Sequence, residues 1–303
     1  MGHRRYTTQY RQIRSINLRS ILRHAALSTL DASDRVTGRM ALALSKERVQ
    51  FLYLHHVFED EEDSFRILLR ALLDTGHRLI SYSEAVERVR KGNINGKPHV
   101  VFSFDDGLKN GLRAARIMSE FGAKGCFFVC PSIVGETNHQ KIQEFCSKRL
   151  NKPPMEFLSW DDLSTLLEEG HDVGAHTMTH PNLAQMPVQQ MQEEIGDSFE
   201  ALAERVGKPK HFSWPFGRFS HFGPVPARTV FEVGFESCAS AERGCHVARS
   251  VKQKMELCLR RDHIVAGWPP NHTLYFMARN SRRASAHDDE WPPEWSKVIQ
   301  RGP

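Results

Sequence analysis

Short apolar runs alternate along most of the chain with stretches in which apolar residues recur every three or four positions. The apolar runs are expected to be strands, and they cover 51–57, 77–81, 100–104, 125–130, 172–175, 211–214, 235–239 and 257–265. The periodic stretches predict helices, and they cover 64–75, 84–91, 108–121, 160–170 and 188–206. Strands that alternate with helices are typical of a parallel sheet, and this many units predict an α/β fold closed into a barrel.

Three regions fall outside this alternation. Residues 1–48 are rich in arginine, contain only three acidic residues and carry apolar positions near helical spacing. They predict a basic helical extension or leader, which either packs on the barrel or makes peripheral contact with a membrane. Residues 131–157 are polar and predict an irregular insertion, and residues 278–303 predict a polar tail with tryptophan and proline. The barrel domain is expected to span 49–277.

The composition fits one domain of barrel size and excludes several classes of protein. The chain has 303 residues, of which 40% are hydrophobic, and its net charge is +5. No lysine-rich stripe accompanies that charge, so no nucleic-acid partner is expected. We see neither a signal peptide nor an apolar run of roughly 20 residues, the length that spans a bilayer. A cytoplasmic location, or a peripheral one at the inner membrane face, is expected, with the six cysteines as free thiols.

Two adjacent carboxylates close the most apolar of the expected strands. The stretch 100–107 reads VVFSFDDG, so Asp105 and Asp106 stand at the carboxyl end of a strand buried on both faces. Neighbouring acids repel each other and resist burial unless a cation or hydrogen-bond donors hold them. The bland alternative is an Asp-Asp-Gly turn at the surface.

A pair of histidines follows another expected strand. His176 and His180 are four residues apart, which places both imidazoles on one side of a helical turn, within reach of one ion. Thr177 or Thr179 could hold that turn by bonding to its backbone. In a parallel barrel, the strand ends gather on one face. Two imidazoles and one carboxylate from the acidic pair would leave open positions, as at a catalytic zinc ion.

These stretches resemble the motifs of a known family. Residues 102–107 (FSFDDG) resemble the T/S-F-D-D-G motif of the polysaccharide deacetylase (NodB-homology) family of carbohydrate esterases. Residues 176–183 (HTMTHPNL) are similar to its H-S/T-x-x-H-P-x-L motif, and 214–217 (WPFG) to its third motif. The resemblance covers about 50–270. It implies a distorted (β/α) barrel of about seven parallel strands, one divalent metal ion and removal of acetyl groups from sugars.

The resemblance also implies roles for individual residues. Asp106, His176 and His180 would hold the metal, and Asp105 would be the general base toward a metal-activated water. The backbone N–H near Phe216 would help to stabilise the oxyanion. Zinc suits the donor set, with cobalt, nickel and manganese as alternatives. Substrate contacts are expected from the remaining members of the site, namely Trp214, Pro215, Gly217, Arg261 and Trp268.

The chain departs from the family pattern at two positions. Many members place an arginine, which orients the base, two residues before the proline of the third motif, where this chain has Ser213. Arg260 or Arg261 is expected to substitute. The family's late histidine, the general acid, has no clear counterpart. His263 is the candidate, because Asp262 could raise its pKa; a surface histidine is the alternative, and the rival candidates are His246 and His272.

The expected activity is hydrolysis of acetyl groups, most simply N-linked, on an acetylated sugar or polysaccharide. A second hypothesis keeps the fold and changes the substrate to an O-acetyl ester or a formamido group on a lipid- or nucleotide-linked saccharide. A third is a catalytically silent carbohydrate-binding domain, which the second acid at Asp105 disfavours. His55 and His56, at the end of the first strand, either line the rim of the site or pack beside it.

Overall fold

The computed structural model describes residues 6–13, 27–29, 33, 36–248, 256–285 and 291–299. Much of the expected N-terminal extension lies outside these ranges. Of its arginines, Arg11 lies within the short helix η1 (Tyr10–Gln12), and Arg39 begins α2 (Arg39–Leu44). None of the helices among the described residues combines the length and the apolar character needed to cross a bilayer.

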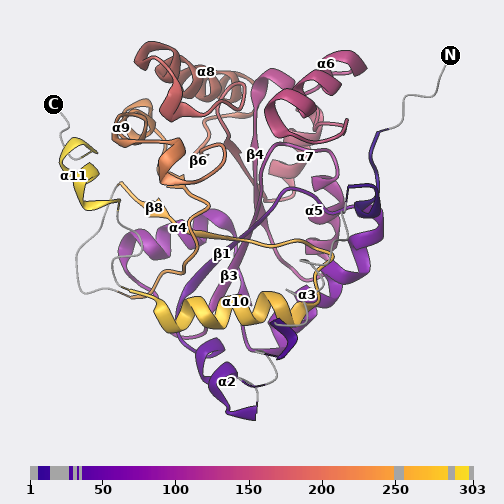
Figure 1. Ribbon diagram of the computed structural model, residues 1–303, viewed down its shortest axis with the longest axis vertical. Helices are drawn as coiled ribbons and strands as arrows, with labels where there is room; N and C mark the ends of the chain where they lie inside the picture. The colour runs from indigo at the N-terminus through magenta and orange to yellow at the C-terminus, as the bar shows by residue number, and fades with distance from the viewer. Residues whose placement is uncertain are drawn as a thin grey trace.

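One parallel sheet curls into a nearly closed barrel at the centre of the molecule, with helices around it (Figure 1). Eight strands of the described chain follow one another in the order β8-β7-β6-β5-β4-β3-β1-β9, and β2 pairs with β3 beside this path. The strands are β1 (Val49–Leu54), β2 (Arg78–Leu79), β3 (His99–Phe104), β4 (Gly125–Val129), β5 (Asp172–Ala175), β6 (His211–Ser213), β7 (Ser237–Ala239), β8 (Cys258–Leu259) and β9 (Arg261–His263). The expected parallel barrel is confirmed.

The barrel closes through a broken strand. The sequence predicts one continuous strand over 257–265, and this is wrong: β8 pairs with β7, whereas β9 pairs with β1. Between them, the Arg260 N–H donates to Nε2 of His246 at 3.1 Å instead of to a strand. The interruption lets one short run of chain turn from one edge of the sheet to the other.

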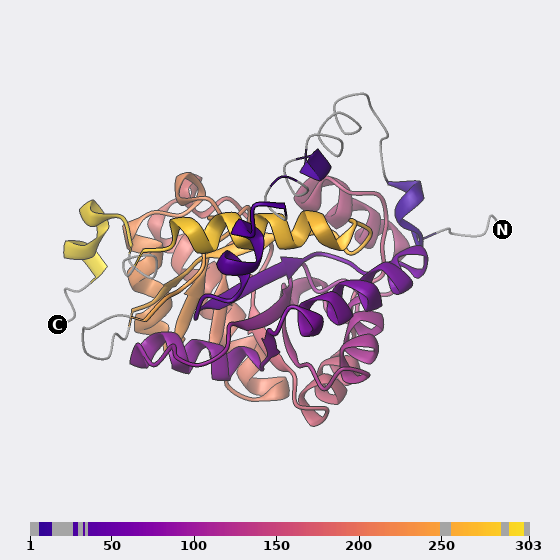
Figure 2. The same cartoon turned by 90° about the horizontal axis from the view of Figure 1, so that it is seen from below.

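Helices cover the outside of the barrel (Figures 1 and 2). They are α3 (Glu62–Asp74), α4 (Tyr82–Lys91), α5 (Gly111–Ser119), α7 (Trp160–Glu168), α8 (Val188–Val206), α9 (Pro224–Val233), α10 (Pro270–Arg283) and α11 (Pro293–Ile299). The sequence did not predict the last three. Helix α10 crosses the expected boundary at residue 277 and is tied to α2 by a hydrogen bond from Ser281 Oγ to the Ala43 carbonyl (2.7 Å).

The insertion at 131–157 is more regular than predicted. It contains the short helix η3 (Pro131–Ile133), the helix α6 (His139–Phe145) and a π-helical turn η4 (Cys146–Leu150). Ile142 and Cys146 of this segment are buried against Met155 in a small apolar cluster. These two apolar residues are four positions apart, which is helical spacing, but the polar composition of the segment concealed this signal of a helix.

Alternation along the strands sets what faces the barrel interior. Val101, Ser103 and Asp105 lie on one face of β3, since successive side chains point to opposite faces. Val101 belongs to an apolar cluster with Phe51 and with Tyr82 of α4. Ser103 and Asp105 lie nearer the carboxyl ends of the strands. The interior therefore changes from apolar to polar toward the end where catalytic groups gather in parallel barrels.

Candidate metal and catalytic site

The acidic pair stands where β3 ends. The Asp105 N–H donates to the Leu54 carbonyl at 3.0 Å, which extends the pairing of β3 with β1 by one residue. Asp106 then takes a left-handed conformation (φ 76°), followed by Gly107 (φ 69°). This sharp turn gives the two carboxylates different directions, although they are neighbours in the chain.

The histidines lie on a compact loop after β5, not on the predicted helical turn. The His176 N–H donates to the Val129 carbonyl at 2.8 Å, and Thr177 and His180 are both left-handed, with φ 62°. The Thr177 hydroxyl oxygen accepts the His180 N–H at 3.0 Å, so a threonine does hold the loop. Glu194 of α8, which the sequence did not single out, accepts hydrogen bonds from the Thr179 N–H (2.8 Å) and hydroxyl (2.5 Å).

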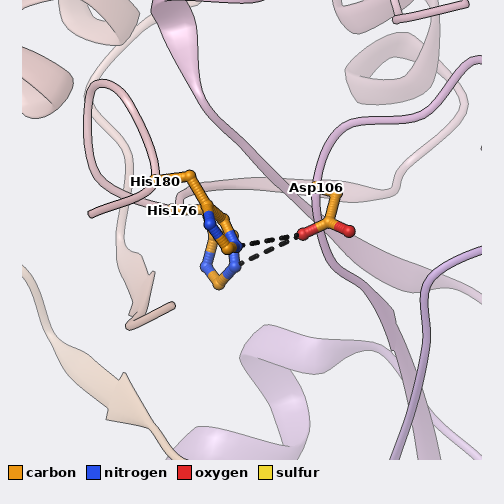
Figure 3. A group of neighbouring side chains, drawn as sticks. All are labelled: Asp106, His176 and His180. Atoms are coloured by element: carbon orange, nitrogen blue, oxygen red, sulfur yellow. Dashed lines mark ion pairs between the residues drawn. The ribbon is translucent and has the colours of Figure 1, made fainter. Parts of the chain in front are cut away.

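The two loops bring three potential ligands together. One oxygen of Asp106, Oδ1, lies 3.7 Å from Nε2 of His176 and 3.4 Å from Nε2 of His180. Both imidazoles point at this oxygen (Figure 3). One ligand atom from each residue lies within 4.8 Å of the others, and all three side chains are buried.

This group fits a divalent metal ion. Nδ1 of His176 lies 2.7 Å from the Ser213 carbonyl, to which it donates when Nε2 is the unprotonated nitrogen. Burial lowers the pKa of His176 to about 4, so the ring is neutral at neutral pH, as a ligand must be. Two imidazole nitrogens and one carboxylate oxygen suit zinc and also cobalt, nickel or manganese.

A lysine that the sequence did not single out completes the group. Nζ of Lys152 lies 2.7 Å from Oδ2 of Asp106, the oxygen that faces away from the histidines. Burial alone would raise the pKa of Asp106, but the charge of Lys152 and the nearby histidines hold it well below its usual value. Asp106 is therefore ionised. The loop that carries Lys152 lay in the region predicted to be irregular.

The second acid, Asp105, is aligned by an arginine from the closing strand. Arg261 donates from Nη1 to Oδ1 at 2.8 Å and from Nη2 to Oδ2 at 2.9 Å. It also donates to the Ser213 hydroxyl at 2.6 Å. Ser213 occupies the position at which many family members have an arginine. Arg261 is fully buried and lies behind Asp105; its predicted contact with substrate stays a prediction. Of the two expected substitutes, the structure favours Arg261 over Arg260.

A cavity of about 130 Å³ opens onto these residues. It is lined by Tyr53, His55, Asp105, Asp106, Leu150, Lys152, His176, His180, Trp214, Phe216, Gly217 and Ala241. Pro215, Arg261, His263 and Trp268, which the sequence assigned to the site, are absent from this lining. Phe216 has φ 63° and is 51% exposed at the cavity. A Cβ on Gly217 would lie 2.2 Å from Cβ of Ala241, so only glycine fits this turn.

His263 lies one layer behind the cavity. Its ring packs 5.2 Å from that of His55, which does line the cavity, and 6.3 Å from that of Trp268. The expected rise of its pKa is wrong: burial and the charge of Arg243 lower the pKa of His263 to about 4. Asp262 points to the other face of β9 and binds Gln50 at 2.6 Å, away from the imidazole.

The other histidines named from the sequence have structural partners. His246 accepts the Arg260 N–H, and His272 on α10 lies 3.3 Å from the Ser28 hydroxyl. Nδ1 of His56 lies 2.9 Å from Oε2 of Glu61. Of the two histidines that end the first strand, His55 lines the cavity.

A parallel barrel with a buried Asp-His-His group at the carboxyl ends of its strands defines a candidate metal centre in a (β/α) fold. Residues 92–222 match the model of the family described as polysaccharide deacetylase. This match contains all three potential ligands and Asp105. The predicted resemblance to the polysaccharide deacetylases is confirmed, and the barrel is NodB-like.

Two curated relatives come from Bacillus subtilis (strain 168). The peptidoglycan-N-acetylmuramic acid deacetylase PdaA is 26% identical over 153 residues, and the match covers 49% of this chain and 49% of PdaA. YxkH is 21% identical over 194 residues, covering 62% of this chain and 63% of that protein. The chain thus spans about half to two thirds of the length of these relatives.

Solved structures share the fold at lower identity. The deacetylase PplD of Streptococcus pyogenes, solved with acetate, superposes with a TM-score of 0.60 at 18% identity, covering 76% of this chain and 98% of PplD. IcaB from Ammonifex degensii gives a TM-score of 0.61 at 19% identity, with 77% of this chain and 98% of IcaB covered.

Proposed function

We propose that this protein is a metal-dependent hydrolase that removes acetyl groups, most simply N-linked ones, from an acetylated sugar or polysaccharide. The observation that carries the proposal is that an acid outside the group of three potential ligands lies beside that group. Asp105 is held by Arg261 and lines the same cavity as Asp106, His176 and His180. A purely structural ion would not need this second acid.

The residues divide the chemistry between them. A divalent ion held by Asp106, His176 and His180 would acidify a water molecule and polarise the acyl carbonyl. Asp105 would accept the proton of that water, since both of its oxygens keep a lone pair beyond the bonds to Arg261. The Phe216 N–H, on an exposed left-handed turn at the cavity, would donate to the oxygen that becomes negative in the transition state.

His263 remains our candidate for the general acid that protonates the leaving amine. Its low pKa makes it neutral in the resting protein, so it would have to receive a proton before it could donate one. His55 lines the cavity and packs against His263, so it would lie between that ring and a substrate bound in the cavity.

The proposal is tested by metal content and acyl release measured on the same preparation. The purified protein, loaded with Zn²⁺, Co²⁺, Ni²⁺ or Mn²⁺ in turn, is incubated with N-acetylglucosamine oligomers, O-acetylated sugars and a formamido sugar. Acetate from the N-acetylated oligomers, abolished by a chelator and restored by metal, is the expected result. Acetate or formate only from the other substrates would move the activity to the second hypothesis. Bound metal without release of either acid would leave a carbohydrate-binding domain.

A cytoplasmic or membrane-face location and membrane contact through the basic N-terminus stay predictions. They concern residues of which many lie outside the described ranges. The identity of the substrate would connect location and membrane contact, because a lipid-linked saccharide would be presented at a membrane surface. Release of acetate or formate from vesicle-borne substrate would support that link.

A further inference from the structure

Lys152 holds a place in the site that the proposed chemistry does not use. It is the only lysine or arginine among the described residues that line the cavity. Its ammonium contacts Oδ2 of Asp106, while Oδ1 faces the two histidines. The Lys152 side chain is 21% exposed and that of Asp106 is 3% exposed, so the pair lies at the inner wall of the cavity.

The backbone of the insertion places the Lys152 side chain in the cavity. The π-helical turn η4 ends at Asn151, which adopts a left-handed conformation (φ 51°) and redirects the chain into the site. The Lys152 N–H donates to the Cys146 carbonyl at 2.9 Å, and two residues further on the Pro154 carbonyl accepts the Thr7 N–H at 2.9 Å. Interruptions of this π-helical kind are frequent at functional sites. Lys152 is thus anchored on both sides in the chain.

The ammonium and a metal ion would have to share one carboxylate. The ammonium of Lys152, 2.7 Å from Oδ2, offsets the negative charge of buried Asp106. A divalent ion on the same carboxylate would meet the ammonium at a separation of a few ångströms. Repulsion between a single and a double positive charge there exceeds the contribution of one charge-assisted hydrogen bond, even when screened as near a protein surface.

We propose that Lys152 is a positioning residue that weakens the binding of the divalent ion, because its ammonium competes with that ion for Asp106. This inference rests on the metal centre of the proposed function. Coupling between two ligands is reciprocal, so a bound ion weakens the contact between Lys152 and Asp106 by the same factor. Metal binding then releases a positive charge into the cavity, next to the place of the substrate.

The first test measures metal affinity in matched variants. Zn²⁺ is titrated calorimetrically into metal-free wild type, Lys152→Gln and Lys152→Arg. Lys152→Gln keeps a hydrogen-bond donor and loses the charge, and its Kd is expected to fall about tenfold or more. Lys152→Arg keeps the charge and should stay near wild type. Lys148→Gln is the control, because Lys148 lies on the same turn, pairs with Glu144 and is 70% exposed.

A second test uses the wild-type protein and does not depend on a folded variant. Limited acetylation with acetic anhydride, read by mass spectrometry, reports how often each lysine amine leaves its partner. Saturating Zn²⁺ is expected to raise the acetylation of Lys152 relative to that of Lys148. Unchanged or reduced acetylation of Lys152 would overturn the proposed competition.

The outcomes separate this inference from the proposed function. If neither wild type nor variants bind Zn²⁺, Co²⁺, Ni²⁺ or Mn²⁺, the metal centre and the role of Lys152 both fail. If wild type binds metal and Lys152→Gln binds it equally or more weakly, only the role of Lys152 fails. In that case the lysine would support the ligand, or merely pack beside it.

Discussion

Backbone strain at single residues is concentrated at the site. Five non-glycine residues in the described part of the chain have a positive φ: Asp106, Asn151, Thr177, His180 and Phe216. Four of them carry the candidate chemistry or hold its loop, and Asn151 precedes Lys152. Each such conformation costs roughly 1 to 3 kcal/mol and persists only where the surroundings enforce it. Turns of this kind aim side chains that a regular strand end would direct elsewhere.

Single substitutions can separate the role proposed for Asp105, the general base, from that proposed for the metal ligands. Asp105→Asn is nearly isosteric and keeps an acceptor for Arg261, so we expect it to bind metal as wild type does. Its rate of acetate release should fall by about 100-fold or more, because an amide cannot accept the proton. His176→Ala should lose both metal and activity. Metal content by atomic emission and acetate release by an enzyme-coupled assay check the pair, and undiminished turnover in Asp105→Asn would refute the assignment.

Among the elements, the short strand β9 makes hydrogen bonds on both faces of the sheet. Arg261 reaches inward to Asp105, whereas Asp262 faces the other way, as alternation in a strand requires. Oδ2 of Asp262 accepts hydrogen bonds from Gln50 of β1 and Asn280 of α10, both at 2.6 Å. This buried acid therefore ties α10 to the barrel at the point where the barrel closes.

That tie predicts a pH dependence of stability. Burial raises the pKa of Asp262 to about 6 from an ordinary value of 3.8. A raised pKa of an acid means that the stability it contributes is complete below about pH 4 and is lost as the pH rises through about 6. Asp262→Asn lacks this titration. Between pH 4 and pH 7, the variant should gain about 3 kcal/mol in unfolding free energy relative to wild type.

Urea unfolding of both proteins at several pH values measures this difference. Stability curves for Asp262→Asn and wild type that run parallel from pH 4 to pH 7 would contradict the role given to Asp262.

At the scale of the whole molecule, the site joins parts of the chain that are far apart. Asp106 follows β3, the histidines follow β5, and Arg261 comes from the strand that closes the barrel. Lys152 arrives from the insertion between β4 and α7. A metal ion held by this group would therefore link separate loops, and its binding should favour the closed barrel over the unfolded chain.

We expect metal to raise the thermal midpoint of the protein. At a free Zn²⁺ concentration 100 times the Kd, the stabilisation is about 2.7 kcal/mol, which for a chain of this size is a rise of about 5 °C. Scanning calorimetry with and without a chelator measures it. His180→Ala, which removes one ligand, should show no rise. A rise of equal size in His180→Ala would place the stabilising ion elsewhere.

The sequence by itself determined the barrel, the three potential ligands and the acid beside them that we propose as the general base. Alternating apolar runs and periodic stretches specify a parallel α/β sheet, because the spacing of apolar residues can be read within each element. The acidic pair and the two histidines could be found because each pair lies on the loop after a strand, and the strand ends share one face. The division of the acids into ligand and base came from the resemblance to the polysaccharide deacetylases.

Only the tertiary structure decided which side chains support them. Lys152, Glu194 and the choice of Arg261 over Arg260 depend on contacts between distant segments, and His263 has a low pKa because the fold buries it. The physical reason is that hydrogen bonds, charge pairs and desolvation act through distances in space. Strand and helix periodicity constrains those distances only within an element, and the closure of the barrel sets the rest.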